Sequence, residues 1–456
     1  MGRTAASNPT PAPLPAQAAS GSIAPQEAKR SGDGLRETVE ALVVAAVAAL
    51  LVRGFEAQAF VIPTGSMAPT LMGRHKEVNC PQCGFTFAVN ASEEVEGFGP
   101  LRSVYSGVCV NCRNQSTRLD AEPSYKGDRI LVSMFPYDLP FLPGASDPER
   151  FDVVVFRYPE EPEVSYIKRL IGLPGETIRI HHGDLFIRPP GGSEFKLQRK
   201  PMDHLRSMQI AVYDDAHQAR ALRDRSDWRR WSPSGEGWSV VDVKSRYRIE
   251  KPTVDWADLR YSHLVPEPEQ WEAILNDRTP GRPPRATLIT DFYSYNTNLP
   301  AENSDLTQTR GDTRNAWLQP HWVGDLTLAA DLETHSERGE IRMELVKGGV
   351  SHFAVIDVAT GKGRFVRGEE TLAEFTTPVV GAGSHRLEFG NVDDRLTLLV
   401  DGRSVGGEGA EFDRGEEPLV PTAADLSPAA ISARGAIVTA SGLVLKRDIY
   451  YTQTPG

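Results

Sequence analysis

The chain has 456 residues, of which 40% are hydrophobic and 24% are charged, so it can bury more than one core and is expected to form two or three globular units. Its formal net charge of −11 comes without a dense run of lysine or arginine, which argues against nucleic acid as a partner. Four cysteines are too few to form a disulfide scaffold in a chain of this length.

The N-terminal part predicts a disordered tail followed by a helix. Residues 1–34 are rich in proline, alanine and serine and have few large apolar side chains. Ala41–Val52 is an uncharged run of mostly Ala, Val and Leu. A spanning helix needs about 20 apolar residues, so this segment is marginal on hydropathy alone. We expect a transmembrane helix over residues 35–60, with Arg53 and Glu56 near the far interface. The alternatives are a helix that lies in the membrane interface and a buried helix of a soluble domain.

Three basic residues precede this helix: Lys29, Arg30 and Arg36. Positive charge favours the cytoplasmic side of a membrane helix. The bulk of the chain is therefore expected on the exported side of a single-pass membrane protein.

Directly after the predicted helix, the stretch FVIPTGSMAPTL (Phe60–Leu71) places Ser66 on a glycine-containing turn. Taken alone, a serine there is more often a turn residue than a nucleophile. A hundred residues later, the run SYIKRLIGLPGETIRI places Lys168 among the apolar residues Ile167, Leu170 and Ile171. A lysine inside such a strand pattern is rare.

The four cysteines form two C-x2-C pairs, Cys80 with Cys83 and Cys109 with Cys112. Two such pairs supply the four thiolates of a closed tetrahedral zinc site, so we expect structural zinc in a ribbon-like insertion over residues 80–119. Disulfide bonds are the alternative, because an exported location is oxidising.

Most of the remaining chain reads as β structure, so the predicted fold class is mainly β. Short strands split by Gly and Pro turns are expected to form a β core, and period-two alternation later in the chain predicts a jelly-roll-like sandwich. The predicted units are a core (61–79, 120–200 and 440–456), an irregular or helical connector (201–286), a sandwich (287–415) and a linker (416–439).

The Ser66 and Lys168 stretches, together with GDRILV (Gly127–Val132) and FDVVVFRYP (Phe151–Pro159), closely resemble the type I signal peptidases, or leader peptidases. The resemblance implies a membrane-anchored serine endopeptidase that removes N-terminal signal peptides from exported preproteins at a bacterial-type plasma membrane. It implies Ser66 as nucleophile, Lys168 as general base and no catalytic cofactor. Because lysine is a base only when neutral, burial and an apolar surface facing the bilayer are expected to lower its pKa.

By the same resemblance, the oxyanion is met by the backbone N–H of Ser66 and the hydroxyl of Thr64. Shallow pockets for small residues at −1 and −3 of the cleavage site fall on the apolar residues Phe60, Ile62, Met67 and Ile167. The substrate is expected to add as an extended strand beside the Ser66 and Lys168 segments.

One departure from the family is a GDN-type block that normally closes its sequence and is not found after Tyr451. The nearest lookalike is RGDTRNAW (Arg310–Trp317). Either the chain stops before this block, or other residues support the lysine in its place, or the Ser66–Lys168 dyad is inactive.

The strands near residue 400 resemble the last hairpins of concanavalin-like or laminin-G-like folds. The alternative function is therefore a membrane-tethered protein whose sandwich binds carbohydrate or protein and whose peptidase core is inactive or incomplete.

Overall fold

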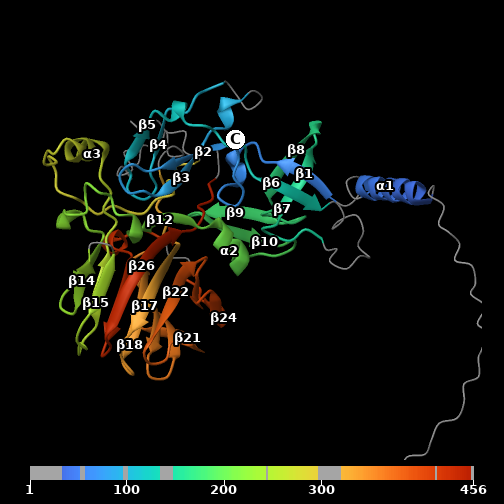
Figure 1. The fold of residues 1–456 in the computed structure, drawn as a ribbon. Helices are drawn as coiled ribbons and strands as arrows, with labels where there is room; N and C mark the ends of the chain where they lie inside the picture. Colours follow the sequence, from blue (N-terminus) through green and yellow to red (C-terminus); the bar gives the residue numbers. More distant parts are fainter. Residues whose placement is uncertain are drawn as a thin grey trace, which may run out of the picture. The chain divides into compact units, whose positions relative to one another are not determined.

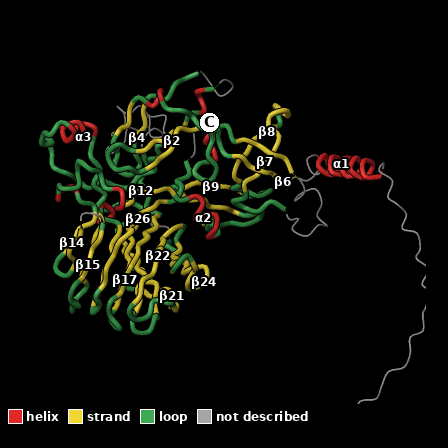
Figure 2. The backbone as a smooth tube through the Cα atoms, viewed as in Figure 1, coloured by secondary structure: helices red, strands yellow, loops and turns green. Residues whose placement is uncertain are grey.

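The computed structural model describes residues 33–51, 57–95, 101–133, 147–242, 245–295, 320–415 and 419–452. Within these ranges the chain is mainly β, as predicted (Figures 1 and 2). The predicted tail up to residue 32 and the RGDTRNAW stretch lie outside the described residues.

The predicted long N-terminal helix is shorter than expected. Helix α1 covers Asp33–Leu51, and strand β1 occupies Ala57–Val61. The prediction of one helix over the whole of residues 35–60 is therefore wrong. Helix α1 begins with a hydrogen bond from Thr38 Oγ1 to the Gly34 carbonyl and carries an exposed Arg36–Glu40 pair. None of the helices in the described ranges is long and apolar enough to cross a membrane.

The sandwich consists of two large antiparallel sheets that share one core. The eight-stranded sheet has the order β14 (Trp238–Asp242), β15 (Arg246–Ile249), β26 (Val438–Arg447), β17 (Leu326–Thr334), β22 (Gly383–Val392), β23 (Arg395–Val400) and β24 (Arg403–Glu411), with β12 (Ile210–Asp214) also paired to β26. The seven-stranded sheet has the order β13 (Trp231–Ser234), β16 (Ala257–Tyr261), β25 (Ala429–Arg434), β18 (Glu340–Lys347), β19 (Val350–Asp357), β20 (Lys362–Arg367) and β21 (Glu370–Thr376).

Alternation along these strands sends one set of side chains into the space between the sheets. Leu328 and Phe389 of the first sheet and Met343 and Phe365 of the second all belong to this buried core. Apolar burial of this extent is the main favourable term in folding, so the sandwich is the part of the chain with the largest described core.

The structure corrects the predicted boundaries of the sandwich. Strand β26 was expected to return to the peptidase core, but it pairs with β17 inside the eight-stranded sheet. The predicted linker contains β25, which pairs with β18, and the predicted irregular connector supplies strands β12 to β16. The sequence pattern did not predict these strands, because they are short and lie far in sequence from the strands with which they pair.

The predicted core strands form small separate sheets. The pairs are β1 with β6 (Arg129–Ser133), β2 (His75–Asn79) with β3 (Thr86–Asn90), β4 (Ser106–Val108) with β5 (Gln115–Thr117), and β7 (Val153–Tyr158) with β8 (Glu161–Arg169); β9 (Thr177–His181), β10 (Asp184–Arg188) and β11 (Lys196–Leu197) form a three-stranded sheet. Two short helices follow in the chain, α2 (Met202–Met208) and α3 (Pro268–Leu275).

A buried ion-pair network joins the segment after β11 to the sandwich. Lys200 Nζ lies 2.8 Å from Asp393 in the β22–β23 turn and 2.6 Å from Asp448 after β26. All three side chains are almost fully buried. Burial raises the pKa of Asp448 to about 6, while the two carboxylates raise the pKa of Lys200 against the effect of its own burial.

Candidate active site and cysteine cluster

Ser66 lies on the single helical turn η2 (Gly65–Met67), between β1 and β2. The chain folds back on itself there, since Arg74 N donates to the Pro63 carbonyl at 3.1 Å. Gly73 permits this approach: a Cβ at that position would lie 2.3 Å from the carbonyl carbon of Thr64. The loop is also fixed by Asp128, whose carboxylate accepts a hydrogen bond from Met72 N at 2.7 Å.

Lys168 lies near the end of β8, opposite Val154 of β7. Its Nζ atom lies 2.8 Å from Ser66 Oγ and donates a hydrogen bond to it, although the two residues are 102 positions apart in sequence. The structure therefore brings the two predicted dyad residues into direct contact. The distance is within the range expected for a nucleophile and its general base.

Arg169, the next residue, fixes the end of β8 to the serine-bearing loop. Its guanidinium donates to Thr70 Oγ1 at 2.8 Å and to the Phe151 carbonyl at 2.7 Å, and Thr70 Oγ1 donates to the Ser207 carbonyl at 3.2 Å. Burial lowers the pKa of Arg169. The sequence analysis did not single out Arg169 and missed this contact. A hydroxyl four residues after the serine was the available signal.

The surroundings of the dyad differ from the expectation. Ser66 and Lys168 are both exposed, and Ile167, Leu170 and Ile171 are only half-buried. The predicted burial of Lys168 within the chain is therefore wrong, because β7 and β8 form a two-stranded sheet that is too narrow to enclose a long side chain. Within the described ranges, no carboxylate lies within ion-pair distance of the Lys168 amine.

The other predicted site residues surround the same turn. Thr64 is half-buried and precedes η2, and its hydroxyl makes no capping hydrogen bond to the turn. Ile62 and Met67 are buried, whereas Phe60 and Ile167 are half-buried. The N–H of Ser66 has no acceptor within the turn, as is usual for the first residues of a helix. The oxyanion and pocket roles of these residues stay predictions.

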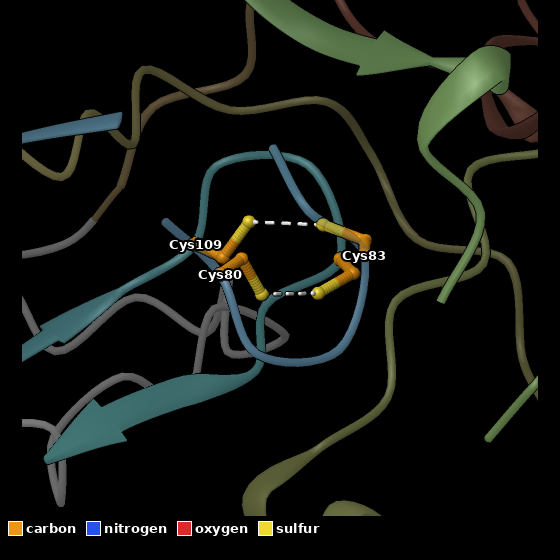
Figure 3. A group of neighbouring side chains, drawn as sticks. Cys80, Cys83 and Cys109 are labelled. Atoms are coloured by element: carbon orange, nitrogen blue, oxygen red, sulfur yellow. Dashed lines mark hydrogen bonds between the residues drawn. The ribbon is translucent and has the colours of Figure 1, made fainter. Parts of the chain in front are cut away.

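The four cysteines form one buried cluster (Figure 3). Cys80 Sγ lies 3.5 Å from Cys112 Sγ, and Cys83 Sγ lies 3.6 Å from Cys109 Sγ. All four are free cysteines, so the alternative of disulfide bonds is not seen. Sulfurs about 2.3 Å from a central zinc ion lie about 3.8 Å apart at the corners of a tetrahedron, so the thiol geometry fits a zinc ion.

Residues from the predicted connector cover this cluster. Trp271 Nε1 donates to the Cys112 carbonyl at 3.2 Å, and His217 Nδ1 lies 3.2 Å from the Cys83 carbonyl. Trp228 of the same connector and Phe292, which follows it, pack in the same buried cluster as the four cysteines. Trp228 and Trp271 are therefore packing residues.

Part of the chain is similar to a known protein family. Residues 110–228 match the family model described as "Signal peptidase, peptidase S26". This range includes Lys168 and begins after Ser66. This part of the chain is thus similar to the S26 class of serine peptidases.

Two curated relatives make the likeness more specific. Signal peptidase I of Pseudomonas aeruginosa is 54% identical over 59 residues, which cover 12% of this chain and 21% of that protein. Signal peptidase I of Rickettsia canadensis is 32% identical over 139 residues, which cover 30% of this chain and 38% of that protein. The chain thus spans between about a fifth and two fifths of the length of these relatives.

Among solved structures, a Bacillus subtilis protein of unknown function with a galectin-like fold is similar at a TM-score of 0.30 and 9% identity. That match covers 54% of this chain and all of the other protein. A likeness at this level carries no argument about function.

Proposed function

We propose that the protein is a serine endopeptidase that removes N-terminal signal peptides from exported preproteins, after small residues at −1 and −3. Ser66 is the nucleophile and Lys168 is the general base. The observation that carries the proposal is the 2.8 Å contact between Lys168 Nζ and Ser66 Oγ. The S26 match over residues 110–228 supports the same reaction class.

Each half of the proposed reaction, acylation and deacylation, needs two proton transfers. A neutral Lys168 amine takes the proton of Ser66 Oγ as this oxygen attacks the scissile carbonyl carbon, and the resulting ammonium then protonates the leaving amine. The N–H of Ser66 and the hydroxyl of Thr64 are the proposed donors to the oxyanion. Water then attacks the acyl-enzyme, and Lys168 again accepts and returns the proton.

Exposure of Lys168 gives the substrate a further role in this proposal. Strand β8 pairs with β7 along one edge, and no other strand of the described chain pairs with it. An extended substrate can add to a free edge of this kind through backbone hydrogen bonds. A signal peptide bound there would exclude water from the amine and so disfavour its charged form.

The test is cleavage of a signal-bearing precursor by the full chain and by its Ser66→Ala and Lys168→Met variants. We expect each variant to lose at least about 1,000-fold in kcat/KM, since the nucleophile and its base act as a unit. Lys362→Met, at an exposed lysine of β20, is the matched control and is expected to cleave normally. Unchanged cleavage by both dyad variants would exclude the proposed mechanism.

We also propose that the four cysteines hold a structural zinc ion. Four thiolates would fill its coordination sphere and leave no open position for catalysis. Zinc content should be close to one ion per chain and should fall in Cys80→Ala and Cys109→Ala, while an added chelator lowers the unfolding temperature of the parent protein. A metal-free chain with the same unfolding temperature would contradict the proposal. The location at a bacterial-type plasma membrane stays a prediction.

A further inference from the structure

The outer face of the seven-stranded sheet has a hollow of about 270 Å³. It is lined by an aromatic residue from the loop before β16, by side chains of β18, β19, β20 and β25, and by the β20–β21 turn. Three arginines lie in this lining, Arg342, Arg364 and Arg434, against one acidic residue, Glu369. This composition differs from that of the apolar core on the opposite face of the same sheet.

Strand register explains why these side chains meet. Arg342 of β18 is paired with Val355 of β19, and Val355 is paired with Arg364 of β20. Residues directly opposite one another project to the same side of a sheet, so the two arginines flank Val355 on one face. The neighbours Ile341 and Met343 alternate to the other face and are buried in the core.

The guanidinium groups are held in place by carboxylates at the sides of the hollow. Arg342 donates from Nη2 to Asp258 at 3.3 Å and from Nε to Ser432 Oγ at 3.3 Å. Arg364 donates to Glu340 at 3.4 Å, and Arg434 donates to the same carboxylate. The pairs restrict the side chains before any ligand arrives, which lowers the entropy lost on binding.

These pairs leave hydrogen-bond donors unused. Each guanidinium has five N–H donors, and among the described residues the Nη1 atoms of the three arginines have no acceptor. Asp258, Glu340 and Glu369 equal the three arginines in number, so the hollow offers free hydrogen-bond donors rather than an excess of positive charge. These donors suit a ligand that is rich in acceptors, and a carboxylate matches the geometry of a guanidinium group best.

Aromatic groups supply an apolar side to the same hollow. The Arg342 guanidinium lies 4.3 Å from the ring centroid of Trp256 and 4.9 Å from that of Phe353, and Trp256 is half-buried. Val355 and Val366 complete the apolar lining. A ligand with an apolar C–H surface and peripheral oxygen atoms matches this combination, and a sugar ring has both.

Other ligand classes fit less well. Strand β18 is paired with β25 and β19 on its two sides, and β19 is paired with β18 and β20, so no backbone groups are free for an extended peptide. The net charge of −11 disfavours polyanions such as nucleic acids. A compact ring with a single carboxylate needs no free backbone groups and is not a polyanion, so neither argument excludes it.

We propose that this hollow is a binding site for a saccharide that bears a carboxylate, such as a uronic or sialic acid. The carboxylate contacts the guanidinium groups of Arg364 and Arg434, and the ring lies against the apolar side chains of Val355 and Val366, because the Trp256 ring is already covered by Arg342 and Arg434. The site belongs to the sandwich and does not depend on the proposed peptidase function.

The test uses the full chain and an array of uronic-acid and sialic-acid saccharides, each beside its neutral counterpart, followed by calorimetry on the best binder. We expect binding at least 10-fold tighter than for the neutral sugar. Arg364→Gln and Arg434→Gln should each weaken it at least 10-fold. Their side chains are 42% and 43% exposed, so the variants should fold. Arg403→Gln, at an exposed arginine of β24 in the other sheet, is the matched control.

Three results would overturn the proposal. The first is that no acidic saccharide binds at millimolar concentration, and the second is that binding is unchanged in both glutamine variants. The third is that inorganic phosphate displaces the saccharide equally well, which would indicate a general anion site. Cleavage of a signal-bearing precursor by Arg364→Gln should equal that of the parent chain, which separates this site from the peptidase reaction.

Discussion

The β7–β8 hairpin and the sandwich show two ways of holding functional side chains. In the hairpin, Lys168 is exposed and reaches Ser66 from a two-stranded sheet, and its position depends on a few hydrogen bonds between segments far apart in sequence. In the sandwich, the arginines of the outer face lie on strands that are paired on both sides and backed by a buried core. Stability and placement thus come from different sources in the two regions: local ties in one and apolar burial in the other.

The largest effect that would test this comparison is the loss of a phenyl ring. Phe389 of β22 is fully buried, whereas Phe156 of β7 is 42% exposed. Phe389→Ala should lower the free energy of unfolding by about 3–5 kcal/mol, because it removes apolar burial and leaves a cavity. Phe156→Ala should lower it by less than about 1 kcal/mol. Urea unfolding measures both, and equal losses would contradict the difference between the regions.

A second effect concerns pH and the sandwich alone. His352 of β19 is 2% exposed, stacks on Phe412 and has its pKa lowered to about 4, mainly by burial and also by Lys347 and Arg367. The pKa of an unfolded histidine is about 6.5, so the stability that the neutral ring contributes is complete above that pH and is lost as pH falls through 4. The expected loss from pH 7 to pH 4 is about 3 kcal/mol.

His352→Phe removes this titration, so the variant should lose about 3 kcal/mol less than the parent chain between pH 7 and pH 4. Urea unfolding at the two pH values measures the loss of stability in each protein. The contributions of other titrating groups cancel when the two losses are compared. His181→Phe, at an exposed histidine of β9, is the control. If parent and His352→Phe lose equal stability, His352 is not the group responsible.

The smallest effect would sharpen the account of the hairpin. Arg169 and Thr70 tie β8 to the Ser66 loop, so Arg169→Met should lower kcat of the proposed reaction about 10- to 100-fold through misplacement of Lys168, with KM little changed. Thr70→Val should have a smaller effect in the same direction, and the double variant should be no worse than Arg169→Met. Arg157→Met, at an exposed arginine of the same hairpin, should behave like the parent chain. Additive losses in the double variant would show that the two residues do not act as one tie.

The sequence alone identified the residues that carry the proposed chemistry. Lys168 stands out because a lysine is unusual in an apolar strand pattern, and the two cysteine pairs stand out by their spacing. Ser66 was found through the resemblance of its stretch to a peptidase family, and period-two alternation predicted the sandwich strands with long regular runs. These signals are local, so they survive without knowledge of the partners.

Only the tertiary structure decided which distant segments meet. It placed β26 beside β17, brought Trp271 to the cysteine cluster and tied Arg169 to Thr70. It also left Lys168 exposed on a hairpin that pairs with no further strand among the described residues. Strand pairing and burial depend on contacts between residues a hundred or more positions apart, and no local pattern of apolar and polar residues specifies those contacts.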